Sequence, residues 1–263
     1  MPTNFIPDDS VTLGETPQAS TAAGRVYDDL RLRILAMELP PGSTLSRPDL
    51  ARDYGVSQTP VREAIQRLGQ DGLVDIFPQS RTVVTRIDVT KLYEAHFLRT
   101  ALEVEVVRRL AGNPDAGLIG RLRAIVAMQS TLVGNVGQVS YFNSLDETFH
   151  RTLFGGVHQI GLHRLVRARS GHLTRARRLE LPMEGKMRVI VDGHGRVIDA
   201  IEAGDAAAAD EAMRVHLSGT VSRVDALQIQ FPDYFRPAET EPSQRPPVRT
   251  KNTAKSTAAA STE

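Results

Sequence analysis

Asp146 and three histidines are the side chains of this sequence whose types and spacing best suit chemistry. Asp146 and His150 lie four residues apart in a segment with a helical apolar period, so they share one helix face. Phe149 and neighbouring leucines mark that face as buried. A carboxylate and an imidazole need partners there, because isolated burial of polar groups is costly.

His194 and His216 are placed to be those partners. The helical period that His194 opens ends at Gly204, ten residues further on, and His216 follows the glycine by twelve residues. At about 1.5 Å per residue, an antiparallel pair of helices brings the two imidazoles to a similar height. Three histidines and one aspartate suit a divalent metal ion with positions open for a ligand, so we expect Zn²⁺, with Ni²⁺, Mn²⁺ or Fe²⁺ as alternatives. A structural or exposed role is the usual one for a lone histidine, and we assign it to those outside this register: His96, His158, His163 and His172.

Arginines supply a second set of candidates. Arg99 and Glu103 lie four apart on an expected helix, either as an exposed pair of little energy or as polar groups among core positions. Six further arginines cluster between residues 164 and 178. A solvated helix face explains most of them, and Arg169 or Arg175 is the candidate to point inward towards an anionic effector.

The segment 24–88 has the pattern of a DNA-reading module. A short helix begins at Arg47, Gly55 turns the chain into a second helix, and that helix ends at Gly72. Two β-prone runs then flank Pro78-Gln-Ser-Arg81 and predict a hairpin. Helix, glycine turn, polar-faced helix and hairpin form the layout of a winged helix–turn–helix.

The start of the second helix carries chemistry for reading bases. Arg62 can bond a guanine edge with two hydrogen bonds, and Gln58 can bond adenine. Small side chains there let the helix N-terminus approach phosphate. A structural hairpin with a solvated face is the alternative, because arginines and acidic residues are about equally numerous in this segment. The expected DNA-contacting set is Arg47, Ser57, Gln58, Thr59, Arg62 and Arg81.

Runs of consecutive residues in this module are more specific than the spacing of single residues. Leu45-Ser-Arg-Pro-Asp-Leu-Ala51, Tyr54-Gly-Val-Ser-Gln-Thr-Pro-Val-Arg-Glu-Ala64 and Asp71-Gly-Leu-Val74 closely resemble the DNA-binding domain of the GntR family. The later helices resemble the effector domain of its FadR subgroup, called FCD, and the likeness covers residues 24–230. An Asp-x-x-x-His pair followed by two histidines matches the metal-binding type of that domain.

The resemblance implies partners and one further site residue. A homodimer would read a short palindromic operator in double-stranded DNA, and a small organic acid would bind at the metal. Arg99, within Leu98-Arg-Thr-Ala-Leu-Glu103, would be the effector-binding residue. Two positions depart from the family pattern, because Pro48 stands where many relatives have arginine and the wing tip lacks their glycine. Arg47 and Arg81 are the candidates to replace those contacts.

Bulk composition bounds these expectations. The 263 residues carry a net charge of +1, so DNA binding must rest on a local face. Cysteine is absent, which excludes disulfides and thiolate metal sites and fits a cytoplasmic protein. No apolar run is long enough for a membrane span, and no signal peptide is visible. We expect a disordered arm at 1–23, a winged helix–turn–helix DNA-binding domain at 24–88, an antiparallel all-α bundle for effector binding and dimerisation at 89–231, and a disordered tail at 232–263.

A mainly α fold with these sites predicts a ligand-responsive transcription regulator, a repressor rather than an enzyme. A metal-dependent hydrolase with an appended module is the alternative, and it needs a general base beside the metal-bound water. Glu147 adjoins the metal set but points off the face of Asp146 and His150, because neighbouring helix residues diverge by about 100°. A constitutive architectural DNA binder would leave the buried metal set without a purpose.

Overall fold

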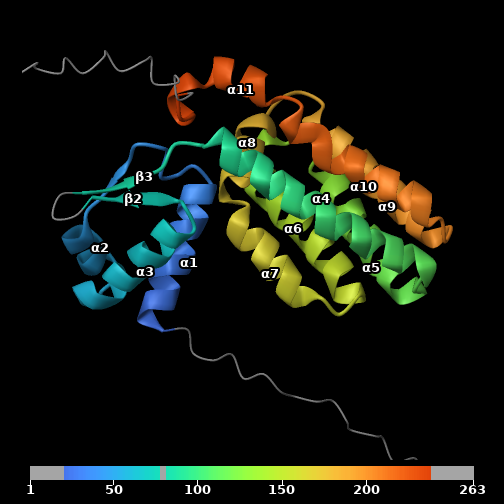
Figure 1. The fold of residues 1–263 in the computed structure, drawn as a ribbon, viewed down its shortest axis with the longest axis horizontal. Coiled ribbons are helices and arrows are strands. Elements are labelled where there is room, and N and C mark those ends of the chain that lie inside the picture. The colour runs from blue at the N-terminus through green and yellow to red at the C-terminus, as the bar shows by residue number, and fades with distance from the viewer. Residues whose placement is uncertain (1–20, 78–80, 238–263) are drawn as a thin grey trace, which may run out of the picture.

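The computed structural model describes residues 21–77 and 81–237, and helices dominate it (Figure 1). A small head with a three-stranded sheet lies beside a larger bundle of helices. The head contains α1 (Ala22–Leu35), β1 (Thr44–Leu45), α2 (Arg47–Asp53), α3 (Gln58–Gln70), β2 (Val74–Ile76) and β3 (Thr82–Val84). The bundle contains α4 (Val89–Gly112), α5 (Ala116–Thr131), α6 (Val139–Gly156), α7 (Ile160–Arg169), α8 (Gly171–Glu180), α9 (Lys186–Glu202), α10 (Ala206–Val221) and α11 (Val224–Gln230), with short 3-10 helices at Val136–Gln138 and Pro232–Tyr234. The mainly α fold with a winged head is confirmed.

The head is a winged helix–turn–helix. Apolar residues of α1 and α3 form its core, in which Leu30 and Leu68 are fully buried. Gly55, at φ 63°, makes the turn between α2 and α3 in a conformation that disfavours other residues. Strand β3 lies between β1 and β2 and is antiparallel to both, with Asp75 opposite Val83. The hairpin is as predicted, whereas β1 is missing from the prediction because two residues carry no detectable period.

The bundle is built around α4, which packs against α6, α9 and α10. Val107, Phe149 and Ile201 lie in its core. Helices α9 and α10 are joined by a tight turn in which Asp205 accepts hydrogen bonds from the first backbone N–H groups of α10. His194 lies in the middle of α9, so the expectation that it opens this helix is wrong. The apolar period of α9 continues for two turns before His194. The number of residues that separates each histidine from the turn at Gly204 is nevertheless as predicted.

Both ends of the described chain are more regular than expected. Helix α1 begins at Ala22, so the last residues of the expected arm are helical. Phe235 is buried, and the backbone of Tyr234 and Arg236 pairs with Ile87. Burial of that aromatic ring keeps residues 232–236 on the bundle, so the expected boundary of a disordered tail at residue 232 is wrong. The remainder of both expected disordered segments lies outside the described residues.

Helix α8 connects the bundle to the head. Arg175 is fully buried and donates to the carbonyl oxygen of Thr85, just after β3, at 2.5 Å and to its hydroxyl at 3.2 Å. Nδ1 of His172 accepts from the backbone N–H of Asp88 at 3.0 Å. A Cβ on Gly171 would lie only 2.7 Å from the side chain of Leu73, so glycine permits this close approach. The head thus rests on the first turns of α8. Within the described ranges, no helix is both long and apolar enough to cross a membrane.

Candidate metal centre and DNA-reading surface

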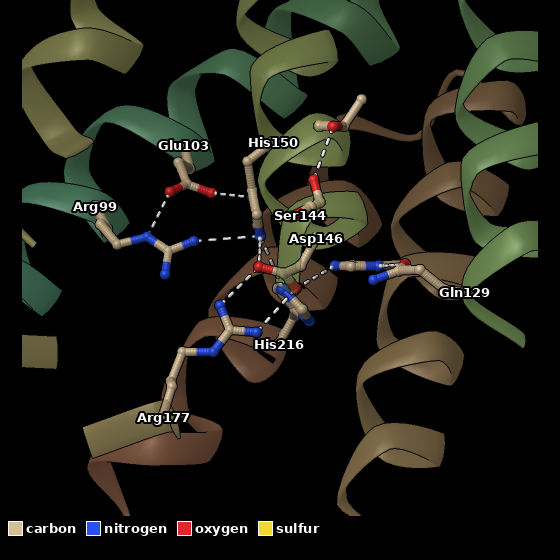
Figure 2. Close-up of polar contacts among 10 residues, drawn as sticks. Arg99, Glu103, Gln129, Ser144, Asp146, His150, Arg177 and His216 are labelled. Atoms are coloured by element: carbon tan, nitrogen blue, oxygen red, sulfur yellow. Dashed lines mark hydrogen bonds and ion pairs between the residues drawn. The ribbon is translucent and has the colours of Figure 1, made fainter. Parts of the chain in front are cut away.

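Four side chains from three helices converge inside the bundle, and Figure 2 labels three of them, Asp146, His150 and His216. Helix α6 carries Asp146 and His150 on one face, α9 carries His194, and α10 carries His216. One ligand atom from each lies within 4.8 Å of the others, and all four are buried except the half-buried His216. The register inferred from the sequence therefore brings these four residues together.

Two polar side chains contact the imidazoles. Oε2 of Glu103 lies 2.7 Å from Nδ1 of His150, within ion-pair distance but without the geometry of a hydrogen bond. Oε1 of Gln129 lies 2.8 Å from Nδ1 of His194. When Nδ1 of His194 donates its proton to the Gln129 oxygen, its Nε2 keeps a lone pair that faces the centre. Partners of this kind fix the tautomer and ring orientation of metal-binding histidines.

The arrangement of the ligand atoms fits a divalent metal ion. Nε2 of His194 is buried, has no hydrogen-bond partner among the described residues, and lies 3.5 Å from Oδ1 of Asp146. The Nε2 atoms of His150 and His216 face each other at 3.4 Å, so a proton or a cation must separate their lone pairs. Nitrogen and oxygen ligands in tetrahedral coordination to one zinc ion lie about 3.4 Å apart. A contraction of the set from separations within 4.8 Å to this spacing would form a coordination site.

Burial favours the neutral form of two of the histidines, His194 and His216, and this is the form that binds metal. It lowers the pKa of His194 to about 3 and the pKa of His216 well below its ordinary value. Burial also raises the pKa of the Asp146 carboxyl, but the Arg177 guanidinium outweighs this effect and holds that pKa well below its usual range. The set therefore offers an ionised carboxylate from Asp146 and neutral imidazoles from His194 and His216 at neutral pH.

Two guanidinium groups border the same ligand atoms (Figure 2). Arg177 of α8 donates to both carboxylate oxygens of Asp146, at 2.7 and 2.8 Å. Arg99 of α4 lies 2.7 Å from Glu103, and its Nη2 lies 3.2 Å from Nε2 of His150. The two side chains expose only 14% and 11% of their surface. The open reading of the Arg99–Glu103 pair is thereby resolved, because both residues lie inside the bundle.

Arg177 and Gln129 are missing from the sequence-based site. The expectation that Arg169 or Arg175 points towards an effector is wrong, since Arg169 is exposed and Arg175 binds Thr85. The arginine-rich stretch is divided between two helices, because α7 ends at Arg169 and α8 begins at Gly171. The arginines therefore do not follow one helical period. A single glutamine on an amphipathic helix gives no signal that separates a buried partner from a surface residue.

Glu147, the only general base considered from the sequence, lies away from the ligand atoms. Its carboxylate pairs with Nε of Arg167 at 2.7 Å, on the side of α6 that faces α7. The prediction that it points off the face of Asp146 and His150 agrees with this contact. The geometry gives it no place beside a metal-bound water.

The head presents most of the predicted DNA-contacting side chains to solvent. Ser57 has the backbone conformation of a helix N-cap, but its hydroxyl makes no capping hydrogen bond. Arg47, at the start of α2, is half-buried. Gln79 and Ser80 of the wing tip lie outside the described residues. The exposed members of the set are Ser57, Gln58, Thr59, Arg62 and Arg81.

Family models match both parts of the chain. One described as bacterial regulatory proteins, gntR family, matches residues 22–84, and one described as FCD domain matches residues 92–219. An uncharacterized HTH-type transcriptional regulator in an unstable DNA locus of Streptomyces ambofaciens is 36% identical over 210 residues, which cover 80% of this chain and 88% of that protein. The HTH-type transcriptional repressor RspR of Escherichia coli is 26% identical over 215 residues, covering 80% of this chain and 92% of that one.

Solved structures share the fold. McbR/YncC of E. coli has a TM-score of 0.66 at 18% identity, over 80% of this chain and 99% of that chain. A putative transcriptional regulator GntR from Rhodococcus sp. RHA1 has a TM-score of 0.65 at 20% identity, over 78% and 97%. At these identities the likeness extends to the fold alone.

Proposed function

Because this chain belongs to the gntR family of bacterial regulatory proteins and carries an FCD domain, we propose that it is a transcriptional repressor controlled by a small organic acid bound at a divalent metal ion. DNA binding is assigned to residues 24–88, and effector binding and dimerisation to residues 89–231. The chain then belongs to the metal-type members of the FadR subgroup. The metal is Zn²⁺, with Ni²⁺, Mn²⁺ or Fe²⁺ as alternatives.

The observation that carries the proposal is the buried set of Asp146, His150, His194 and His216. These four residues would hold the metal ion, which supplies a Lewis-acidic centre for the oxygen atoms of a carboxylate. Buried imidazoles with unmatched lone pairs are costly in a purely structural core. Arg99 borders the ligand atoms and is the effector-binding residue of this proposal, because a guanidinium forms charge-assisted hydrogen bonds with a carboxylate.

The head would read DNA through the first turns of α3. Arg62 and Gln58 are exposed there and carry side chains that bond guanine and adenine edges. Ser57, Thr59 and the flanking arginines at positions 47 and 81 would contact the phosphate backbone or neighbouring bases. This division between base readout and backbone contacts is typical of a winged helix–turn–helix.

A homodimer would place two heads on an inverted repeat, because one short helix reads few base pairs. Tyr93 and Phe97 lie one turn apart on α4 and are exposed, Phe97 by 77%. An aromatic pair on the outside of the longest helix supports α4 as part of the interface with a second copy of the chain.

The coupling between effector and DNA would run through α8. Arg177 of this helix holds Asp146, while Arg175 and His172 hold the segment that follows the wing. A change at the metal centre that moves Arg177 therefore acts on the element that supports the head. Such a movement would change the spacing of the two heads and thus DNA affinity.

A thermal-shift screen of full-length protein against organic acids tests the proposal. Protein stripped by a chelator and reloaded with zinc should melt at a higher temperature, and a matching acid should raise the melting temperature further. His194→Ala should abolish the zinc-dependent shift. Wild-type protein that shows no zinc-dependent shift contradicts the proposal, and conversion of the bound acid into a product assigns the protein to the enzymes.

A further inference from the structure

The buried charges around the metal centre cancel before a metal ion is added. Arg99 pairs with Glu103 and Arg177 pairs with Asp146, and a histidine that coordinates a metal ion does so in its neutral form. Glu180 lies further along α8, and its charge is matched by Lys186 at 2.6 Å. A divalent ion brings two positive charges that no described residue of this cluster offsets. Uncompensated charge in a buried site is strongly unfavourable, so two negative charges must come from outside.

Hydrogen bonding leads to the same requirement. Arg177 has no acceptor other than the Asp146 carboxylate among the described residues. Arg99 keeps Glu103 as a partner, but its Nη2 is directed at Nε2 of His150. A bound metal ion would take the lone pair of that Nε2 and a lone pair of the Asp146 carboxylate, so that neither could accept a hydrogen bond there. Both guanidiniums then hold buried N–H groups without acceptors, which is costly.

The two guanidiniums reach the centre from different helices, Arg99 from α4 and Arg177 from α8 (Figure 2). A single carboxylate supplies one negative charge and pairs in a bidentate manner with one guanidinium. An anion with two carboxylates supplies both charges and an acceptor group for each arginine. Charge balance and hydrogen bonding therefore select the same class of ligand.

We infer that the effector is a dicarboxylate, with one carboxylate paired with Arg99 and the other with Arg177, and that Arg177 determines this specificity. The inference rests on the proposed function, because the charge imbalance arises only when a metal ion binds. Arg177 then has two partners in turn: Asp146 before the metal ion binds and the second carboxylate afterwards. Binding of metal and of dicarboxylate should consequently be cooperative.

Isothermal titration of zinc-loaded, full-length protein tests the inference with three pairs of acids: malonate and propionate, succinate and butyrate, glutarate and valerate. Each pair has the same number of carbon atoms and differs by one carboxylate. At least one dicarboxylate should bind about tenfold or more tightly than its partner, as expected for a charge-assisted pair in a buried site. Zinc content is assayed after each titration, so that removal of the metal by the acid is detected.

Arg177→Gln should bring this ratio close to one. Arg178→Gln is the matched control, since Arg178 adjoins it on α8 and donates to the hydroxyl of Ser140; it should keep the wild-type ratio. Arg177→Lys retains the charge without the paired donors, and the ratio should also fall in this variant. It replaces Arg177→Gln as the test if the glutamine variant does not fold. Equal affinities within all three pairs, or an unchanged ratio in both Arg177 variants, would overturn this inference but leave the proposed function standing. Failure of wild-type protein to bind zinc would overturn the proposed function itself.

Discussion

Nη1 of Arg175 donates a hydrogen bond to the backbone carbonyl oxygen of Thr85 at 2.5 Å, across the boundary between the bundle and the head. Arg175 is fully buried, and no carboxylate pairs with it in the part of the chain that the structure describes. Burial lowers its pKa to about 10, so it still carries its charge at neutral pH. Two residues further along α8, Arg177 binds Asp146. A single helix of ten residues therefore contacts both the candidate metal centre and the end of the wing.

Arg175→Met should uncouple the head from the metal centre. Methionine keeps an apolar stem but leaves the carbonyl of Thr85 without its donor, so the free energy of unfolding should fall by about 1–3 kcal/mol. Zinc affinity should stay unchanged, while DNA affinity should no longer respond to succinate or whichever dicarboxylate binds best. Fluorescence anisotropy with labelled DNA measures the response. Arg178→Met on the same helix should respond like the wild type, and a full response in Arg175→Met would rule out α8 as the link.

Gln129→Leu should weaken metal binding although Gln129 is not a ligand. The substitution removes the acceptor 2.8 Å from Nδ1 of His194, so the imidazole loses its fixed tautomer and orientation. Zinc affinity should drop about 10- to 100-fold, as is usual when such a partner is lost. Gln129→Glu keeps an acceptor oxygen and should retain most of the affinity. Zinc affinities measured by competition with a chelating dye check this, and equal values for wild type and Gln129→Leu would exclude the positioning role.

Arg62→Ala should weaken binding to specific DNA by about 1–3 kcal/mol and relax the base preference at one position of each half-site. The side chain is exposed near the start of α3, where a guanine edge is within its reach. Gel-shift titration uses the sequence that wild-type protein selects from a random pool. Arg109→Ala, an exposed arginine at the far end of α4, is the control. Indistinguishable affinities for wild type and Arg62→Ala would remove this residue from the reading surface.

Stability should decrease as the pH falls from about 6.5 to about 4. Burial and Arg175 lower the pKa of His172 from 6.5 to about 4, so in this window the unfolded chain binds a proton that the folded chain does not. The stability contributed by neutral His172 is complete above the unfolded pKa and is lost as pH falls towards the folded one, by about 3 kcal/mol.

His172→Asn should remove this part of the pH dependence. Asparagine keeps an acceptor for the N–H of Asp88 but does not titrate. Chemical unfolding at several pH values should give the variant a shallower slope between pH 6.5 and 4 than the wild type. Parallel curves for the two proteins would show that His172 is equally easy to protonate in both states.

The sequence predicts those parts of the structure that have a period or a turn signal. Asp146 and His150 follow the four-residue spacing of a helix, and the turn at Gly204 sets the heights of His194 and His216. The wing was predictable because β-prone runs flank a short polar turn. These features are local in sequence, or are related through one short turn, so a single chain is enough to read them.

Other parts of the site depend on contacts that no local pattern encodes. Arg177 is one of six arginines within residues 164–178, and only the break between α7 and α8 decides that it faces Asp146. Gln129 comes from a helix whose sequence gives no reason to bury that amide. Phe235 holds the chain after α11 against Ile87, a pairing between residues far apart in sequence. Tertiary packing, rather than propensity, determines these three features.

Zinc content and DNA release measured on the same samples of wild-type and His194→Ala protein test the metal-controlled repressor most directly. Wild-type protein should hold about one zinc ion per chain and release labelled DNA as the best-binding acid is added. His194→Ala should lose zinc, keep its DNA affinity through residues 24–88, and no longer respond to the acid. The exposed His158→Ala should match the wild type in all three properties. Zinc retained at wild-type affinity in His194→Ala, or an undiminished response in zinc-free protein, would contradict the account.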